Sequence, residues 1–152
     1  MRLSILTALA AAAVLAACSP AAEAPQPPEA EAPAAAPPML AGVDLTQPLR
    51  ALGTEPFWAV ELTGSELVYS GVDRPEQRAA NPGPVIQGTT AVYATATGAG
   101  TTLVVTLMDT DCSDGMSDRT YPFTATLEVL AEQREGCAWT ERRGFTPLDG
   151  AN

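Results

Sequence analysis

The chain has 152 residues and a formal net charge of −10 at pH 7, with 18 Asp and Glu residues against eight Lys and Arg, and it contains no His. This acidic balance argues against binding nucleic acid or an anionic lipid surface through the charge of the protein itself. Because His is the commonest general base at neutral pH and the commonest metal ligand, we also expect no enzymatic activity, no metal and no cofactor.

Residues 1–17 have the parts of a secretory signal peptide. Arg2 supplies a positive charge, and an apolar run of 13 residues extends from Leu3 to Leu15. A helix of that length would measure about 20 Å, which is too short to cross a hydrocarbon core of about 30 Å. We therefore interpret residues 1–17 as a removable signal rather than as a permanent transmembrane helix.

Cys18 follows directly after Leu15-Ala16-Ala17. The Leu-Ala-Ala-Cys sequence resembles the lipobox of bacterial lipoproteins. The resemblance implies that Cys18 carries a diacylglycerol thioether, becomes the first residue of the mature protein and is N-acylated. Several acyl chains hold a protein at a bilayer, whereas a single chain binds only marginally. The alternative is an ordinary secretory signal with an incidental Cys.

The residue after the lipobox bears on where the protein resides. Ser19 stands there instead of Asp, which is similar to lipoproteins sorted to the outer membrane. We therefore expect a lipid-anchored, periplasm-facing protein that contacts the bilayer through acylated Cys18, in the outer membrane rather than the inner.

Residues 19–38 contain eight Ala, seven Pro and three Glu, without aromatic or β-branched side chains. Such a segment cannot bury enough apolar surface to offset the entropy of ordering, so residues 18–39 are predicted to be a lipidated Cys followed by a disordered linker. Twenty Pro-rich residues can span about 60 Å. The composition fits a stalk that lifts a domain off the membrane, and equally a segment with no role of its own.

The remaining residues, 40–152, form one predicted domain with seven Arg and 15 acidic residues, a formal charge of −8. Its hydrophobic pattern has a period of two. In residues 57–63, Trp58, Val60 and Leu62 fall on one face, and residues 66–70 follow after Gly64-Ser65, an interval typical of a hairpin.

Further alternating segments follow along the chain. Residues 91–97 and 101–108 are separated by Gly98-Ala99-Gly100, which indicates a second hairpin, with Leu103, Val105 and Leu107 on one face. The clearest alternation covers residues 121–130, where a register slip of one residue would expose the whole hydrophobic set, and residues 137–143 supply a last strand.

This pattern predicts an all-β fold, a small antiparallel barrel or sandwich of about six strands. Helix is expected at most as one turn in residues 46–52 and another in residues 131–134. Residues 71–89 contain Pro75, Pro82 and Pro84 and are predicted to form a long loop.

The chain has three cysteines, and assigning Cys18 to lipid leaves Cys112 and Cys137. An even pair in an oxidising compartment predicts a structural disulfide. The alternatives are a redox-active or metal-binding pair. The sequence shows neither the C-x-x-C spacing of the former nor the further ligands of the latter.

The first motif is Gly53-Thr54-Glu55-Pro56-Phe57-Trp58. Adjacent aromatic residues in a strand point to opposite faces, so one of Phe57 and Trp58 covers the core and the other faces outward. We take Thr54, Glu55, Phe57 and Trp58 as candidate binding residues. The alternative is a simple strand start with Trp58 in the core.

The second motif is Cys112-Ser113-Asp114-Gly115-Met116-Ser117-Asp118, in which Asp114-Gly115 is a strong turn signal. A disulfide there would hold a binding loop, with Asp114, Met116 and Ser117 as candidate binding residues. Asp109 and Asp111 have the D-x-D spacing of an EF-hand. However, Asp114 stands at the sixth position, where Gly is needed, and Thr120 at the twelfth, where Glu is needed, so we predict no calcium site.

These two motifs, the following Arg119–Phe123 segment and Glu135-Gly136-Cys137-Ala138 together resemble an uncharacterised family of proteobacterial envelope proteins. Its members are described as predicted membrane proteins or putative lipoproteins, some joined to META-type heat-shock lipoprotein domains or to modules similar to inhibitors of c-type lysozyme. The chain departs from the family pattern at Asp118, where relatives more often carry Gly. The resemblance implies a β fold, a disulfide and an envelope location, and it implies no reaction.

We therefore predict a membrane-anchored envelope lipoprotein with a non-catalytic domain that binds an unknown periplasmic protein or small ligand. One alternative is an inhibitor of c-type lysozymes, which are basic and would be attracted by a charge of −8. A second is a structural or stress-related protein that supports envelope integrity. A third is an enzyme that uses Glu55 and Asp114 as general acid and base.

Overall fold

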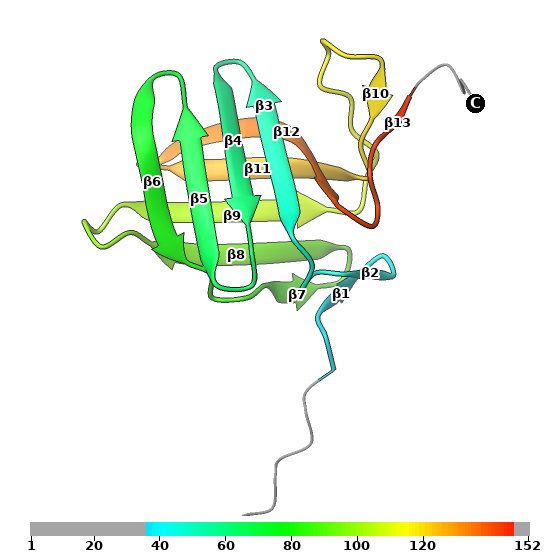
Figure 1. Cartoon of the computed structure of the whole chain (residues 1–152), viewed down its shortest axis with the longest axis horizontal. Coiled ribbons are helices and arrows are strands. Elements are labelled where there is room, and N and C mark those ends of the chain that lie inside the picture. The colour runs from blue at the N-terminus through cyan, green and yellow to red at the C-terminus, as the bar shows by residue number, and fades with distance from the viewer. Residues whose placement is uncertain (1–35, 148–152) are drawn as a thin grey trace, which may run out of the picture. The chain divides into compact units, whose positions relative to one another are not determined.

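The computed structural model describes residues 36–147, which form thirteen β-strands and no helix (Figure 1). The strands of the main sheet, in chain order, are β3 (Leu49–Thr54), β4 (Phe57–Leu62), β5 (Glu66–Gly71), β6 (Arg74–Ala80), β7 (Val85–Gln87), β8 (Thr90–Ala96), β9 (Thr102–Met108), β11 (Phe123–Val129) and β12 (Glu132–Thr140). Two short pairs lie outside it: β1 (Met39–Leu40) with β2 (Val43–Asp44), and β10 (Arg119–Thr120) with β13 (Thr146–Pro147).

The nine strands of the main sheet pair antiparallel in the order β6-β5-β4-β3-β12-β11-β9-β8-β7. The sheet curls into a half-barrel, so β3 to β6 cross over β8, β9, β11 and β12 (Figure 1). Strand β6, at one end of the sheet, approaches β8, which is next to the other end, and there the Thr95 hydroxyl on β8 donates a hydrogen bond of 2.9 Å to the Ala80 carbonyl on β6. The curled sheet therefore encloses one interior.

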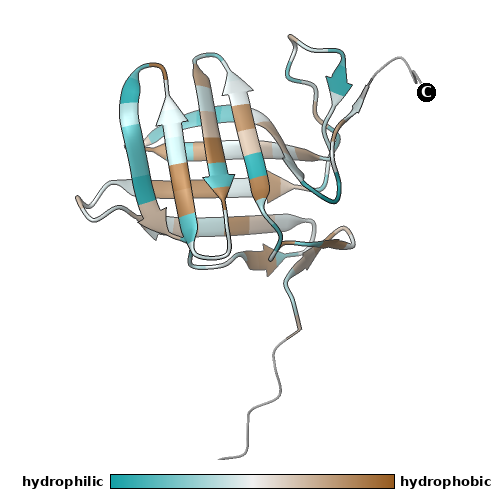
Figure 2. Ribbon diagram, viewed as in Figure 1, coloured by the Kyte–Doolittle hydropathy of each residue, from teal (hydrophilic) through white to brown (hydrophobic). Residues whose placement is uncertain are grey.

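Hydrophobic residues recur along the strands (Figure 2), and their buried side chains fill this interior. The largest fully buried side chains are Tyr69, Tyr93, Tyr121, Phe123, Leu40, Leu49, Leu62, Leu67, Leu103, Leu107, Leu127 and Val60. Burial of this apolar surface is the dominant favourable term in folding. The core therefore reaches every strand of the sheet except short β7, of which Ile86 packs against it partly buried.

The predicted all-β fold, a small antiparallel barrel or sandwich, is confirmed as a half-barrel, and so are the predicted faces. Trp58, Val60 and Leu62 on β4 are buried, as are the alternating apolar residues of β9 and β11. The hairpins predicted at residues 64–65 and 98–100 join β4 to β5 and β8 to β9. The predicted signal peptide 1–17, the lipidation site Cys18 and most of the linker lie outside the described residues.

Three sequence predictions were wrong. Residues 49–52 begin β3 instead of forming a helical turn, and residues 131–134 form the end of a hairpin turn and the start of β12. The predicted loop 71–89 contains β6 and β7. The main sheet therefore has nine strands, not six. Edge strand β6 was missed because its exposed and half-buried residues do not alternate, and β12 begins before residue 137 with mostly exposed residues.

No helix within residues 36–147 has the length and apolar character needed to cross a membrane.

The β11–β12 hairpin has an unusual two-residue turn. Val129 pairs with Glu132, and the two residues between them, Leu130 and Ala131, have φ values of 51° and 63°. Asn-Gly is favoured at such left-handed pairs of residues, whereas most other residues with a Cβ atom are destabilised by about 1–2 kcal/mol each in this conformation. Leu130 is nevertheless 54% exposed, so core packing does not account for a leucine there.

We predict that the double variant Leu130→Asn, Ala131→Gly raises the free energy of unfolding by about 1 kcal/mol, because both new residues adopt positive φ more readily. Urea unfolding followed by tryptophan fluorescence measures this change. Val72→Asn serves as the control, because Val72 is also an exposed residue in a turn but does not have positive φ. An unchanged or lower stability of the double variant would contradict the prediction.

Candidate functional site

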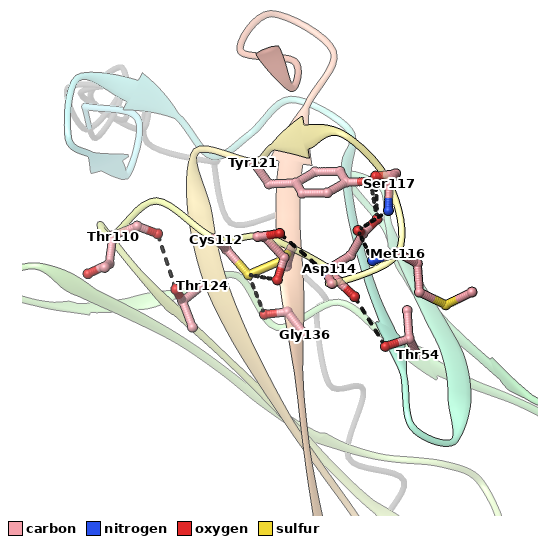
Figure 3. Close-up of a disulfide and its surroundings, with 12 residues drawn as sticks. Thr54, Thr110, Cys112, Asp114, Met116, Ser117, Tyr121, Thr124 and Gly136 are labelled. Atoms are coloured by element: carbon pink, nitrogen blue, oxygen red, sulfur yellow. Dashed lines mark hydrogen bonds between the residues drawn. A yellow bond between two sulfur atoms is a disulfide. The ribbon is translucent and has the colours of Figure 1, made fainter. Parts of the chain in front are cut away.

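The two sequence motifs meet at the end of β3, although they are 60 residues apart in the chain. The Thr54 hydroxyl donates a hydrogen bond of 3.3 Å to the main-chain carbonyl of Asp114 (Figure 3). Thr54, Asp114, Cys112 and Gly136 are among the residues that line a surface groove of about 200 Å³. The candidate residues Thr54 and Asp114 therefore belong to one site.

The segment Cys112–Asp118, here called the disulfide loop, is attached to the sheet at its beginning and after its end. Cys112 forms a disulfide with Cys137 on β12, with a Cα–Cα distance of 5.5 Å. The backbone of Cys112 also pairs with Tyr121 through two hydrogen bonds of 2.9 and 2.8 Å. The predicted Cys112–Cys137 disulfide is confirmed, and it holds the first residue of the loop against β12 (Figure 3).

The Asp114 carboxylate organises the disulfide loop from within. Its Oδ1 accepts hydrogen bonds from the N–H groups of Met116 (3.0 Å) and Ser117 (2.7 Å). Its Oδ2 accepts from the hydroxyls of Ser117 (2.7 Å) and Tyr121 (3.0 Å). The Ser117 N–H is the largest cause that holds the pKa of Asp114 well below its usual range, although desolvation opposes it. Asp114 is therefore an ionised structural acceptor, unsuited to donate a proton at neutral pH.

Sequence analysis missed the aromatic cluster beside this loop. Tyr121, Trp139 and Phe145 pack against one another with ring centroids 5.3 to 6.0 Å apart. The Arg119 guanidinium lies 4.2 Å above the Phe145 ring. Because the Tyr121 hydroxyl bonds to Asp114, the cluster supports the disulfide loop on the outer face of β12. The sequence offered Tyr121 in a predicted strand and Trp139 close to Cys137, but Phe145 comes from a segment without strand pattern, so the cluster could not be assembled from the sequence.

Phe57 and Trp58 face opposite sides of β4, as predicted. Trp58 is 3% exposed and belongs to the core, whereas Phe57 is 51% exposed. A Cβ atom at Gly53 would lie 2.1 Å from the Trp58 Nε1, and one at Gly136 would lie 2.8 Å from the indole Cζ2. Two of the sequence motifs thus contribute a glycine that makes room for the indole. Trp58 therefore packs in the core, and its candidate binding role stays a prediction.

The remaining candidates, Glu55, Phe57 and Met116, lie at the surface. Met116 is 69% exposed on the disulfide loop, and Glu55 is exposed in the β3–β4 turn, which contains a cis Glu55–Pro56 peptide bond. On the other side of β4, the N–H of Val72 donates to the Phe57 carbonyl (3.2 Å). Phe57 and Val72 line a shallow hollow of about 300 Å³.

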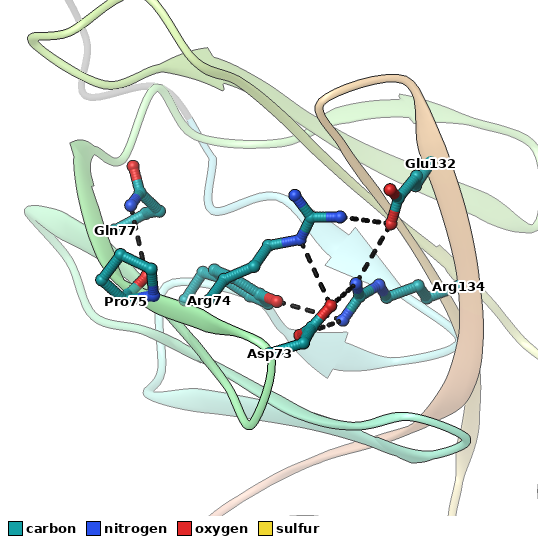
Figure 4. Close-up of polar contacts among 7 residues, drawn as sticks. Asp73, Arg74, Pro75, Gln77, Glu132 and Arg134 are labelled. Atoms are coloured by element: carbon teal, nitrogen blue, oxygen red, sulfur yellow. Dashed lines mark hydrogen bonds and ion pairs between the residues drawn. The ribbon is translucent and has the colours of Figure 1, made fainter.

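A buried arginine connects the β5–β6 turn to the start of β12. The Arg134 side chain is 4% exposed and donates two hydrogen bonds to the Asp73 carboxylate, of 2.6 and 3.2 Å, and one of 3.1 Å to the Tyr69 hydroxyl. It also pairs with Glu132, which contacts Arg74 in turn (Figure 4). These five residues form the Arg134 network.

The Arg134 network affects the ionisation of its carboxylates. The hydrogen bond from Arg134 is the largest cause that lowers the pKa of Asp73, and the hydrogen bond from Arg74 has the same effect on the pKa of Glu132. Sequence analysis placed Arg134 in a helical turn and did not anticipate this network.

No group of three or more Asp, Glu, Cys or His side chains within residues 36–147 is arranged to hold a metal ion. Asp114 accepts hydrogen bonds within the disulfide loop, and Asp73 and Glu132 form ion pairs with arginines.

Comparison with protein-family models, with characterised proteins and with solved structures finds no match to this chain. The resemblance to envelope lipoproteins therefore stays a prediction, and the function has to be argued from the site itself.

We predict that Arg134→Met lowers the free energy of unfolding by about 2 kcal/mol, because it leaves Tyr69, Asp73 and Glu132 without their shared donor. Chemical denaturation at pH 7 measures this loss. The control is Arg50→Met, which removes an ion pair whose side chains are 62% and 55% exposed and should cost less than about 1 kcal/mol. Equal losses in the two variants would contradict the prediction.

We predict that Asp114→Asn is less stable than the parent at pH 7 by about 1–2 kcal/mol, because an amide nitrogen in place of Oδ2 cannot accept the hydrogen bonds that the Ser117 and Tyr121 hydroxyls donate. A carboxyl whose pKa is lower in the folded state stabilises the fold above its unfolded pKa, near 4, and loses this effect as the pH falls further. Thermal unfolding between pH 7 and pH 2 should therefore show a smaller loss of Tm on acidification for Asp114→Asn than for the parent.

Asp118→Asn is the matched control for this experiment, because Asp118 is an exposed acid on the same loop. It should leave the acid dependence of Tm unchanged. Parallel Tm curves for the parent and Asp114→Asn would show that the Asp114 carboxylate does not stabilise the loop.

Proposed function

We propose that this chain is a lipid-anchored envelope lipoprotein whose β-domain is a non-catalytic binding module for another macromolecule. Its binding surface would consist of the disulfide loop and the β3–β4 turn, with Phe57 and Met116 as the principal contact residues. The lipid anchor at Cys18 would keep the domain in the periplasm, within reach of a linker that spans up to about 60 Å.

The observation that carries this proposal is the junction of the two motifs through Thr54 and Asp114. It places an exposed Met116 and an exposed Phe57 on neighbouring segments. The segments beneath them are held by the disulfide, by the Asp114 hydrogen bonds and by the Trp58 packing. Exposed apolar side chains on a pre-ordered frame favour association, because little conformational entropy is lost on binding.

The filled interior supports a macromolecular partner over a small ligand. Inward-facing aromatic and aliphatic side chains from eight of the main strands, including Tyr69, Tyr93 and Phe123, form a single hydrophobic cluster. The hollows beside the candidate residues lie at the surface instead. Small-molecule sites are typically concave and enclosed, whereas protein partners use exposed patches with an apolar centre.

The alternatives receive less support from the site. An inhibitor of lysozyme would need a projecting hydroxyl, but the Ser117 hydroxyl donates to Asp114 within the loop. An acid–base pair of Glu55 and Asp114 would need a carboxyl that exchanges a proton near neutral pH, whereas the surroundings of Asp114 lower its pKa. We therefore advance neither as the function.

Site-specific photo-crosslinking in living cells tests the proposal. A photoreactive phenylalanine analogue at position 57 or 116 of the full-length chain should give the same crosslinked protein from both positions. The analogue at position 85 is the control, because Val85 is 60% exposed on edge strand β7 and lies outside the proposed surface. Identical crosslinks from all three positions, or none from positions 57 and 116, would contradict a binding role for this surface.

The anchor is tested in the same cells. Cys18→Ser should abolish labelling by a clickable palmitate analogue and should move the protein from the membrane fraction to the soluble fraction. Continued membrane retention without label would show that the chain is held by something other than lipid on Cys18.

A further inference from the structure

Three exposed apolar side chains lie at one end of the main sheet, here called the turn end. It comprises the β3–β4, β5–β6 and β11–β12 turns. Phe57, Val72 and Leu130 belong to these turns and are 51%, 74% and 54% exposed. Apolar residues scattered singly over a surface need no explanation, but apolar residues gathered on adjacent turns mark a contact surface.

The structure holds these three turns together. Val72 donates a main-chain hydrogen bond to Phe57, which joins the β5–β6 turn to the start of β4. Asp73, next to Val72, receives two hydrogen bonds from Arg134, and Glu132, two residues after Leu130, pairs with both arginines of the Arg134 network. The three turns of the turn end are therefore connected to one another, and Figure 4 shows the ion pairs among Asp73, Arg74, Glu132 and Arg134.

The charges around the turn end are unbalanced. Residues 53–58, 71–74 and 128–135 contain five acidic residues and two arginines. Both arginines are paired with Asp73 or Glu132. The remaining acids, Glu55, Glu128 and Glu135, form no ion pair among residues 36–147. These three acids, here called the acidic rim, lie on the turns and strand ends that carry the apolar side chains, and no arginine among residues 36–147 offsets their charge.

The backbone of the β11–β12 turn points to the same surface. Leu130 and Ala131 both have positive φ, where Asn-Gly would fit the hairpin without strain. The chain nevertheless places a large apolar side chain in solvent at this position. Backbone strain that folding does not require is commonly found at functional contacts.

We propose that the turn end docks a protein partner whose surface presents lysine and arginine side chains around an apolar depression. The apolar residues would enter the depression while Glu55, Glu128 and Glu135 face the basic rim of the partner. This inference rests on the proposed binding function and extends that surface from Met116 across Phe57 and Val72 to Leu130. A phospholipid surface is a poorer occupant, because phosphate headgroups would be repelled by the acidic rim.

The position of the turn end in the domain agrees with this choice. Strand β3 runs from Leu49, which follows the segment leading in from residue 36, to Thr54 at the turn end. The turn end therefore lies at the far end of β3 from the side where the chain enters the sheet (Figure 1). A partner can therefore reach the turn end without contacting the segment that leads into β3.

Photo-crosslinking at positions 72 and 130 of the full-length lipoprotein tests this inference, alongside positions 57 and 116. The expected result is one crosslinked protein, with a pI above about 9, captured from all four positions. The double variant Glu128→Gln, Glu135→Gln should lower its yield at least about threefold at low salt, because rim charges chiefly affect the association rate. Glu141→Gln, an exposed acid in the loop after β12, is the matched control and should leave the yield unchanged.

Other results would overturn the inference in distinguishable ways. Crosslinks at positions 57 and 116 without any at 72 and 130 would leave the proposed function intact and confine the surface to the disulfide loop. Crosslinks at 72 and 130 to phospholipid, or to an acidic protein, would show that the occupant has the wrong chemistry. The absence of any crosslinked product at all four positions would contradict both the proposed function and its extension.

Discussion

The Trp58 indole packs against Gly53 and Gly136, and a Cβ atom at Gly136 would also lie 1.9 Å from the Leu52 carbonyl oxygen, so β12 can lie this close to the β3–β4 hairpin only because both positions are glycine. Close approach places Cys137 opposite Leu52 on β3, and the disulfide then brings Cys112 and its loop over the end of the same strand. The loop reaches Thr54 for that reason. One buried aromatic residue and two glycines thereby set the geometry of a surface that none of them forms.

Sequence reasoning succeeded where a single strand carries its own signal. Strands β4, β9 and β11 alternate between core and surface, so their faces could be predicted, and the two cysteines after Cys18 could be paired by elimination and compartment. It failed where the structure of a segment depends on contacts with segments that are distant in the sequence. Edge strand β6 buries few side chains and therefore lacks a pattern, and contacts such as Thr54 with Asp114 join segments whose distance along the chain says nothing about their distance in space.

The acidic residues illustrate the same limit. The composition shows only that the chain has a surplus of negative charge. In the structure, by contrast, the carboxylates have three different roles. Asp114 accepts hydrogen bonds inside a loop, Asp73 and Glu132 neutralise arginines, and Glu55 is exposed in a turn without an ion pair among the described residues. Carboxylates of the last kind contribute more to the attraction of a partner than Asp73 and Glu132, because Arg74 and Arg134 offset the charge of those two.

The half-barrel leaves β6 and β7 as the two outer strands of the sheet, each paired with another strand of the sheet on one side only. Strand β6 carries Arg74, Pro75, Glu76 and Arg78, and charges and proline on an outer strand discourage pairing with a strand of another molecule. Strand β7 has three residues, too few to serve as a long template. A lipoprotein confined to a membrane plane, as proposed here, meets its own copies far more often than a freely diffusing protein does. Resistance to sheet-to-sheet aggregation would then be a condition for keeping many copies in one membrane.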